Sequence, residues 1–244
     1  MISLLALGDS YTIGEGVPLY DSFPYQAVQL LRKAGKPFYA PEILARTGWT
    51  TDELAAALSQ TQWLPGYDFV SLLIGVNNQY RGRSREEYGR QFEELLQQAI
   101  RLAAPQSAPS PQGRSNVFVL SIPDWSVSPF AHSNLPDTKG RDREAVSREI
   151  DAFNATAVAI TRRYGIEFLD ITEHTRLPHS TEIPSRPVPH GPTHPDPPDR
   201  PRPSDLGARP ASATSSFAAD GLHPSAVEYG FWAQLLAERI SKYC

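Results

Sequence analysis

Residues 2–10 read Ile-Ser-Leu-Leu-Ala-Leu-Gly-Asp-Ser, a short and largely apolar run that ends in a glycine and two polar residues. A continuous apolar run of this length, bounded by glycine, is typical of a strand that is buried on both faces. Gly8, Gly14 and Gly16 leave the backbone room to turn tightly after the strand. Ser10 is therefore predicted where the strand gives way to the next element, with its hydroxyl facing a cleft.

Similar runs recur along the chain, with segments of helical spacing between them. Strands are expected at 2–7, 69–74, 116–122 and 166–171, with a weaker one at 37–43, and helices at 25–34, 51–58, 85–103, 141–164 and 225–242. In the fourth helix the apolar residues recur at every third or fourth position, as on one buried face: Val146, Ile150, Phe153, Ala157 and Ile160. This alternation indicates an α/β fold with a parallel sheet covered on both faces.

In such a sheet, ligands bind beyond the carboxyl ends of the strands. Ser10, Gly48 and Asn77 follow the first three predicted strands, and Asp220 and His223 come just before the last helix. All five residues are therefore expected at one edge of the sheet. A serine hydroxyl becomes a good nucleophile only when a base activates it. His223 can be that base, and Asp220, three residues earlier, can orient its ring.

Four short blocks, in this order, resemble those of the SGNH, or GDSL-type, hydrolase family. They are Gly8-Asp9-Ser10-Tyr11-Thr12-Ile13-Gly14, Gly48 within Thr47-Gly48-Trp49-Thr50, Gly75-Val76-Asn77-Asn78, and Asp220-Gly221-Leu222-His223-Pro224. Each block is a weak signal alone, but the four in order span nearly the whole chain. The resemblance implies a three-layer α/β/α sandwich, flavodoxin-like, around a central parallel sheet of about five strands.

The resemblance also implies roles for individual residues. Ser10, Asp220 and His223 would form a catalytic triad that cleaves an ester through an acyl-enzyme. The backbone N–H groups of Ser10 and Gly48 and the side-chain amide of Asn77 would form an oxyanion hole. No metal or cofactor is implied. Asn78 stands where the family usually has Asp, and we expect it to replace some of that residue's hydrogen bonds without its charge.

Each block also has a simpler interpretation. Ser10 can be a helix N-cap, and Asp220 can cap the last helix, whose first turn would then contain Pro224. Asn77 and Asn78 can form an ordinary turn, and Gly48 a bend. None of these interpretations explains why the four blocks occur together.

Residues around the expected site are less informative. The aromatic residues that follow the strands can form a pocket wall or belong to the core, and they are Tyr11, Trp49, Tyr80, Trp125 and Phe130. Arg81 and Arg83 can attract an anionic substrate or remain solvated charges. Nothing in the sequence selects among lysophospholipids, short-chain esters, thioesters and acetylated sugars.

Composition limits the class of protein. The chain has 244 residues, 40% of them hydrophobic, and a net charge of −4, which fits one α/β domain and provides no basic surface for nucleic acid. Its single cysteine, Cys244, excludes an internal disulfide. Neither a signal peptide nor a membrane anchor is recognisable, so a cytoplasmic location is expected. The expected partner is a small-molecule ester, and the oligomeric state is left open.

One segment departs from the α/β pattern. Residues 178–216 contain eleven of the 23 prolines and almost no large apolar residue. Such a composition predicts a disordered insertion in the single domain, either a tolerated surface loop or a lid over the site. His190 and His194 have a spacing that binds zinc on a helix, but the neighbouring Pro192 and Pro195 forbid a helix, so no metal is expected.

Two other functions remain open at this stage. A thioesterase or an acyltransferase would use the same triad. A flavodoxin-like module for phosphate or nucleotide would instead use the glycines at 8, 14 and 16 beside a helix N-terminus. That alternative leaves Asn77 and His223 without a role.

Overall fold

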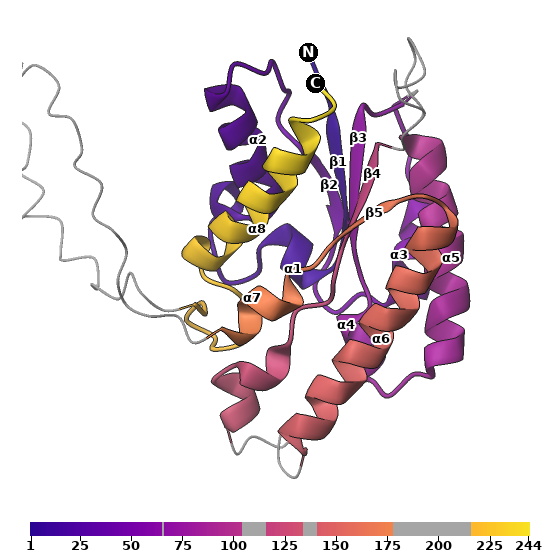
Figure 1. The fold of residues 1–244 in the computed structure, drawn as a ribbon, viewed down its shortest axis with the longest axis vertical. Coiled ribbons are helices and arrows are strands. Elements are labelled where there is room, and N and C mark those ends of the chain that lie inside the picture. The colour runs from indigo at the N-terminus through magenta and orange to yellow at the C-terminus, as the bar shows by residue number, and fades with distance from the viewer. Residues whose placement is uncertain (65, 104–115, 134–140, 178–215) are drawn as a thin grey trace, which may run out of the picture.

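The computed structural model describes residues 1–64, 66–103, 116–133, 141–177 and 216–244. Five parallel strands form one sheet in the order β2-β1-β3-β4-β5 (Figure 1). The strands are β1 (Leu4–Gly8), β2 (Glu42–Ala45), β3 (Phe69–Leu73), β4 (Val117–Leu120) and β5 (Glu167–Leu169). The predicted α/β class is confirmed.

Helices cover both faces of this sheet, as a parallel sheet requires. Helices α2 and α8 pack on each other over one face, and α3, α5 and α6 lie over the other (Figure 1). The longer helices are α2 (Phe23–Lys33), α3 (Thr51–Gln60), α5 (Arg85–Leu102), α6 (Arg143–Arg163) and α8 (Ala226–Ile240). All five were predicted, with ends that differ by only a few residues. This three-layer arrangement is the one that the family resemblance implied.

Three short helices and three 3-10 turns were not predicted. The helices are α1 (Ser10–Ile13), α4 (Val76–Tyr80) and α7 (Thr172–Arg176), and the turns are η1 (Leu19–Asp21), η2 (Trp125–Val127) and η3 (Phe130–His132). An element of three to five residues spans only about one helical turn, which is too short for a hydrophobic pattern to repeat. Two of the helices, α1 and α4, carry predicted site residues.

The position of β2 differs from the sequence prediction of 37–43. Phe38 forms only an isolated bridge with Ile2, and the paired strand begins at Glu42. Pro37 and Pro41 lack the N–H that a regular ladder needs, which delays the strand. β2 is also an edge strand, and its residues are partly exposed, so its apolar pattern is weak.

Helix α6 shows how burial and capping define an element. Its apolar positions, predicted from their spacing, are buried in the core: Val146, Ile150, Phe153, Ala157 and Ile160. Asp142 caps the helix, since its carboxylate accepts the backbone N–H of Glu144 at 3.0 Å. The helix therefore begins at Arg143, two residues after the predicted start.

Two predictions can be compared with the structure only over the described residues. The proline-rich insertion at 178–216 lies, except for Ser216, outside the described residues, as do His190 and His194. In the described residues, no helix has both the length and the apolar character needed to cross a membrane.

Candidate active site

Ser10 begins helix α1 directly after strand β1. Asp9 caps this helix, because its carboxylate accepts the backbone N–H of Tyr11 at 3.0 Å. Ser10 is therefore not the N-cap, and the simpler interpretation of the first block is wrong. A Cβ on Gly8 would overlap the side chain of Thr12 and the carbonyl of Leu73, so only glycine fits between α1 and the neighbouring strand β3.

Asp220 and His223 form a tight turn before α8. The His223 Nδ1–H donates to Asp220 Oδ2 at 2.6 Å. The other carboxylate oxygen accepts the backbone N–H groups of Leu222 at 2.9 Å and His223 at 3.0 Å. Helix α8 begins at Ala226, with Ser225 as its N-cap, so Asp220 does not cap it. The carboxylate instead holds the imidazole in one orientation.

The electrostatics of Asp220 favour its charged form. Burial disfavours the charge, but the hydrogen bonds from the His223 ring and from the backbone N–H groups of Leu222 and His223 outweigh that penalty. They hold the pKa of the Asp220 carboxyl below its ordinary value. The ring that it orients is itself buried and packs against Tyr11, with 5.3 Å between the ring centroids. His223 therefore has a fixed acceptor on one side and an aromatic wall on another.

The loop that follows β2 and the helix that follows β3 meet beside Ser10. Gly48 has φ +83°, a left-handed conformation that favours glycine. The Asn77 Nδ2 donates to the carbonyl oxygen of Trp49 at 3.0 Å and lies 3.5 Å from Asp9 Oδ2. Two acceptors therefore fix which end of the Asn77 amide carries the hydrogens. On the other side of the Gly48 loop, Arg81 donates to the Gly48 carbonyl at 2.6 Å.

Asn78 connects the same two segments. Its Oδ1 accepts the backbone N–H of Thr51 at 3.1 Å, and its Nδ2 donates to Thr51 Oγ1 at 2.7 Å. The side chain is fully buried. The Thr51 hydroxyl gives its own proton to Gln91 Oε1, so the second bond takes its proton from the Asn78 amide. Asn78 accepts and donates at once, whereas an ionised Asp would keep both contacts only if the Thr51 hydroxyl turned its proton away from Gln91.

Asp9 was missed as a functional candidate by sequence reasoning. Its carboxyl is fully buried at the end of β1, between Tyr11 and Asn77. Burial raises its pKa to about 7, against the opposing effect of the hydrogen bonds that it accepts. An acidic residue immediately before a predicted nucleophile was the available signal, but its burial depends on the tertiary structure.

A cavity of about 190 Å³, which we call the active-site cleft, brings most of these residues together. Its lining residues are Ser10, Tyr11, Thr47, Gly48, Val76, Asn77, Tyr80, Trp125, Phe130, Leu222 and His223. Asp220 is not among them and is linked to the cleft by its hydrogen bonds to Leu222 and His223. Every other residue predicted for the triad or the oxyanion hole lines this one cavity.

Four of the five aromatic residues singled out in the sequence also line the cleft. The fifth, Trp49, instead packs against the hydrophobic core and contributes only its carbonyl oxygen. The two arginines are held by carboxylates: Arg81 lies 3.3 Å from Glu53, and Arg83 lies 2.7 Å from Asp52. Neither side chain lines the cleft.

Possible metal ligands in the described part of the chain are its His, Cys, Asp and Glu side chains. No group of three or more His, Cys, Asp or Glu side chains gathers there in a way that could hold an ion. Among the described carboxyl and imidazole groups, His223 lines the cleft, and Asp220 and Asp9 form hydrogen bonds with residues that line it.

Comparison with known proteins identifies the family. The model of the GDSL-like Lipase/Acylhydrolase family matches residues 6–230. A search of curated proteins found no match. Among solved structures, a lipase/acylhydrolase from Enterococcus faecalis has a TM-score of 0.64 at 15% identity, over 99% of this chain and 96% of that chain.

Two further solved structures have the same fold. TesA superposes with a TM-score of 0.62 at 15% identity, over 99% of both chains. The acetylxylan esterase Axe2 from Geobacillus stearothermophilus gives 0.60 at 15% identity, over 98% of this chain and 94% of that chain. At such identities the likeness establishes the fold. The family model spans most of the sequence, so the chain belongs to the GDSL-like lipase/acylhydrolase family and is a hydrolase that acts on ester bonds.

Proposed function

We propose that this protein hydrolyses carboxylic esters through a covalent acyl-enzyme on Ser10, with His223 as general base and Asp220 as the residue that orients it. One observation carries the proposal. The imidazole lines the same cleft as Ser10, while its Nδ1–H is held by Asp220 Oδ2 at 2.6 Å. With Nδ1 as the donor, Nε2 keeps its lone pair and can accept a proton.

In the first half-reaction, the Ser10 oxygen attacks the ester carbonyl carbon and transfers its proton to Nε2 of His223. The resulting imidazolium is stabilised by the Asp220 carboxylate, whose lowered pKa keeps it charged. The tetrahedral intermediate collapses when the bond to the alcohol oxygen breaks. His223 returns its proton to that oxygen, and the alcohol leaves an acyl-Ser10 ester.

Charge develops on the carbonyl oxygen in each tetrahedral intermediate. We assign its stabilisation to the backbone N–H groups of Ser10 and Gly48 and to the Asn77 amide, which all belong to residues of the cleft. The carbonyl of Trp49 holds one hydrogen of the Asn77 amide at 3.0 Å. The other hydrogen has only the longer, 3.5 Å contact to Asp9, which an oxyanion can replace.

In the second half-reaction, water takes the place of the alcohol. His223 removes its proton as it attacks the acyl carbon, and the proton then returns to Ser10 as the acid departs. This sequence consumes one water and restores the enzyme. A thioester would follow the same steps with a thiol leaving group, and an acyltransferase would replace the water with a second alcohol.

Family membership favours hydrolysis over the nucleotide-binding alternative. The test is an activity screen on p-nitrophenyl esters, acyl-CoA thioesters and acetylated sugars, run beside covalent labelling with a fluorophosphonate. We expect ester turnover and labelling in the wild type, and neither in Ser10→Ala. Labelling that persists in this variant would place the nucleophile elsewhere, and a preference for acyl-CoA would make the protein a thioesterase.

A further inference from the structure

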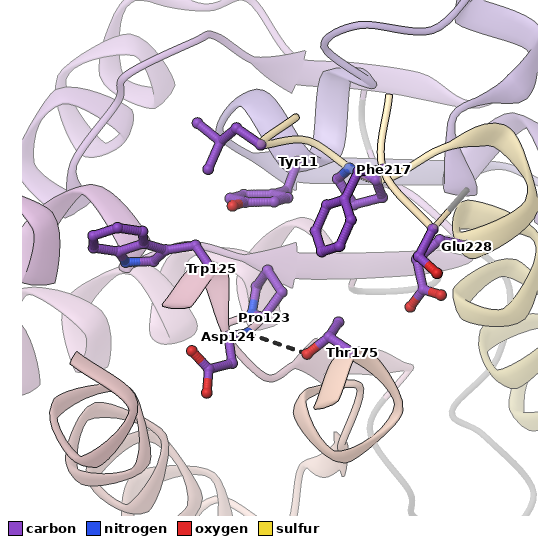
Figure 2. Close-up of a pocket in the computed structure, with 10 residues that line it drawn as sticks. Tyr11, Pro123, Asp124, Trp125, Thr175, Phe217 and Glu228 are labelled. Atoms are coloured by element: carbon purple, nitrogen blue, oxygen red, sulfur yellow. Dashed lines mark hydrogen bonds between the residues drawn. The ribbon is translucent and has the colours of Figure 1, made fainter. Parts of the chain in front are cut away.

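A second pocket adjoins the active-site cleft, and Figure 2 shows the residues that line it. Tyr11, Trp125 and Leu222 line both cavities and therefore form the wall between them. The second pocket is otherwise bounded by residues such as Pro123, Thr175 and Phe217. Its free volume is only about 10 Å³, roughly the space of one water molecule.

The interior of the second pocket is apolar despite two acidic residues in its lining. The Asp124 carboxylate is directed away from the rings of Tyr11 and Phe217 (Figure 2) and accepts hydrogen bonds from Ser147 and Arg176 at 2.7 and 2.8 Å. Glu228 Oε1 accepts the indole N–H of Trp232 at 2.9 Å. Apart from these carboxylates, the lining consists of aromatic rings, prolines and a leucine, with Thr175 and Ser216 as its two aliphatic hydroxyl residues.

The three wall residues differ in how firmly they are held. Trp125 donates its indole N–H to the buried Gln79 at 2.8 Å. Tyr11 packs between His223 and Trp232, with centroid distances of 5.3 and 6.2 Å. Leu222 is half-buried, and only its backbone N–H is bound, to Asp220. Its side chain can therefore be shortened without removing a hydrogen bond that orients the catalytic turn.

The part of the cleft that borders the second pocket suits the acyl part of an ester. The alcohol must leave after the first half-reaction and water must enter, so both need the open side of the cleft. The acyl group stays on Ser10 from the first half-reaction until water releases it as the acid in the second. A cleft of about 190 Å³ is also smaller than the roughly 300 Å³ at which typical ligand pockets begin.

We propose, resting on the esterase function above, that Leu222 is the specificity-determining residue that limits this enzyme to short acyl chains. Its side chain closes the active-site cleft against the second pocket. The space of the three carbon atoms that Leu222→Ala removes, together with that pocket, is a latent site for the distal methylenes of a longer acyl chain. Shortening Leu222 joins the two cavities. Each methylene that then becomes buried improves kcat/KM about fourfold.

The experiment measures kcat/KM for p-nitrophenyl acetate, butyrate, hexanoate and octanoate with the wild type and Leu222→Ala. In the wild type, kcat/KM should fall steeply beyond butyrate. In Leu222→Ala, the ratio of octanoate to butyrate should rise at least about tenfold, which is the gain from two or three buried methylenes. Acetate esters of alcohols of increasing length, run in parallel, should show no such gain.

Two further variants test whether the gain comes from joining the two cavities or from any enlargement of the active-site cleft. Val76 lines only the active-site cleft, so Val76→Ala enlarges that cleft without reaching the second pocket and should change the ratio less than about threefold. Phe217 lines only the second pocket and pairs with Pro224 through its backbone. Adding Phe217→Trp to Leu222→Ala should refill the pocket and bring the ratio back toward the wild type.

The proposal is overturned if Val76→Ala changes the ratio as much as Leu222→Ala, if Phe217→Trp does not reverse the gain, or if the gain follows the alcohol chain. A wild type that already prefers octanoate also contradicts it. These outcomes all require ester turnover. Absence of any turnover in the wild type, together with no fluorophosphonate labelling of Ser10, would instead contradict the proposed function.

Discussion

Asn78 and Thr51 share two hydrogen bonds that join the helix carrying Asn77 to the segment that follows Gly48. The Thr51 backbone N–H donates to Asn78 Oδ1 at 3.1 Å, and Asn78 Nδ2 donates to Thr51 Oγ1 at 2.7 Å. The Thr51 hydroxyl in turn contacts Gln91 Oε1 of α5. The helix that carries Asn77 and the segment that contains Gly48 are thus held together by the buried amide of Asn78.

Asn78→Asp should destabilise the protein by about 1–3 kcal/mol, because the carboxylate cannot donate to Thr51 Oγ1 and would be fully buried. Urea unfolding of the variant measures this loss. A double-mutant cycle of Asn78→Ala with Thr51→Val should give a coupling free energy above about 0.5 kcal/mol. An Asp variant as stable as the wild type would mean that the Thr51 hydroxyl donates to the carboxylate instead, and a coupling free energy near zero would mean that Asn78 does not hold the two segments together.

Asn77→Ala should lower kcat by about 10²–10³-fold, since the oxyanion then loses one of its three donors. KM should change much less, because the donor acts in the transition state. Asn77→Asp should be at least as damaging, because its charge would face Asp9 and the Trp49 carbonyl. Steady-state kinetics on a short-chain ester measure kcat and KM, and urea unfolding checks that each variant is folded. A loss smaller than about threefold would remove Asn77 from the oxyanion hole.

Asp220→Asn should lower kcat by roughly 10⁴-fold, since an amide at this position favours the wrong tautomer of His223. His223→Ala should cost at least as much, and the double variant little more than the worse single one. The loss of stability in Asp220→Asn should be small beside the loss of rate, because the amide oxygen can still accept the backbone N–H groups of Leu222 and His223 and α8 is capped by Ser225. A rate within about tenfold of wild type would show that Asp220 does not orient the base.

The sequence predicted best those elements whose apolar pattern reflects their burial in the folded protein. The apolar run before Ser10 predicted β1, and the spacing from Val146 to Ile160 predicted the buried face of α6. Helices α1 and α4 are too short to produce a period, although they position Ser10 and Asn77. Their existence follows from caps and packing rather than from hydrophobic spacing.

The side-chain hydrogen bonds at the edge of the sheet could not be predicted from the sequence for a different reason. The bonds from Arg81 to the Gly48 carbonyl and from Asn77 to the Trp49 carbonyl join residues that are 33 and 28 positions apart. The order of strands predicts that such loops meet, but it does not say which atoms face each other. The aromatic residues show the same limit, since Trp49 and Trp125 follow strands in the same way and only Trp125 lines the cleft.

The last prediction concerns the buried carboxyl of Asp9 and the dependence of stability on pH. Its pKa in the folded protein is raised to about 7, above the value of roughly 4 expected in the unfolded chain. Between those two values the folded state binds a proton that the unfolded state does not. The contribution of Asp9 to stability is therefore fully present below about pH 4 and is lost as the pH rises through 7.

Asp9→Asn should remove this dependence, and Asn should still cap α1. We therefore expect the free energy of unfolding of the wild type, minus that of the variant, to fall by about 1 kcal/mol per pH unit between pH 4.5 and 6.5 and to level off above 7.5. Urea unfolding at these pH values measures it. The subtraction cancels Asp124 and Asp220, whose lowered pKa values act in the opposite direction. A difference that is flat, or that rises with pH, would mean that Asp9 is ionised in the folded protein throughout this range.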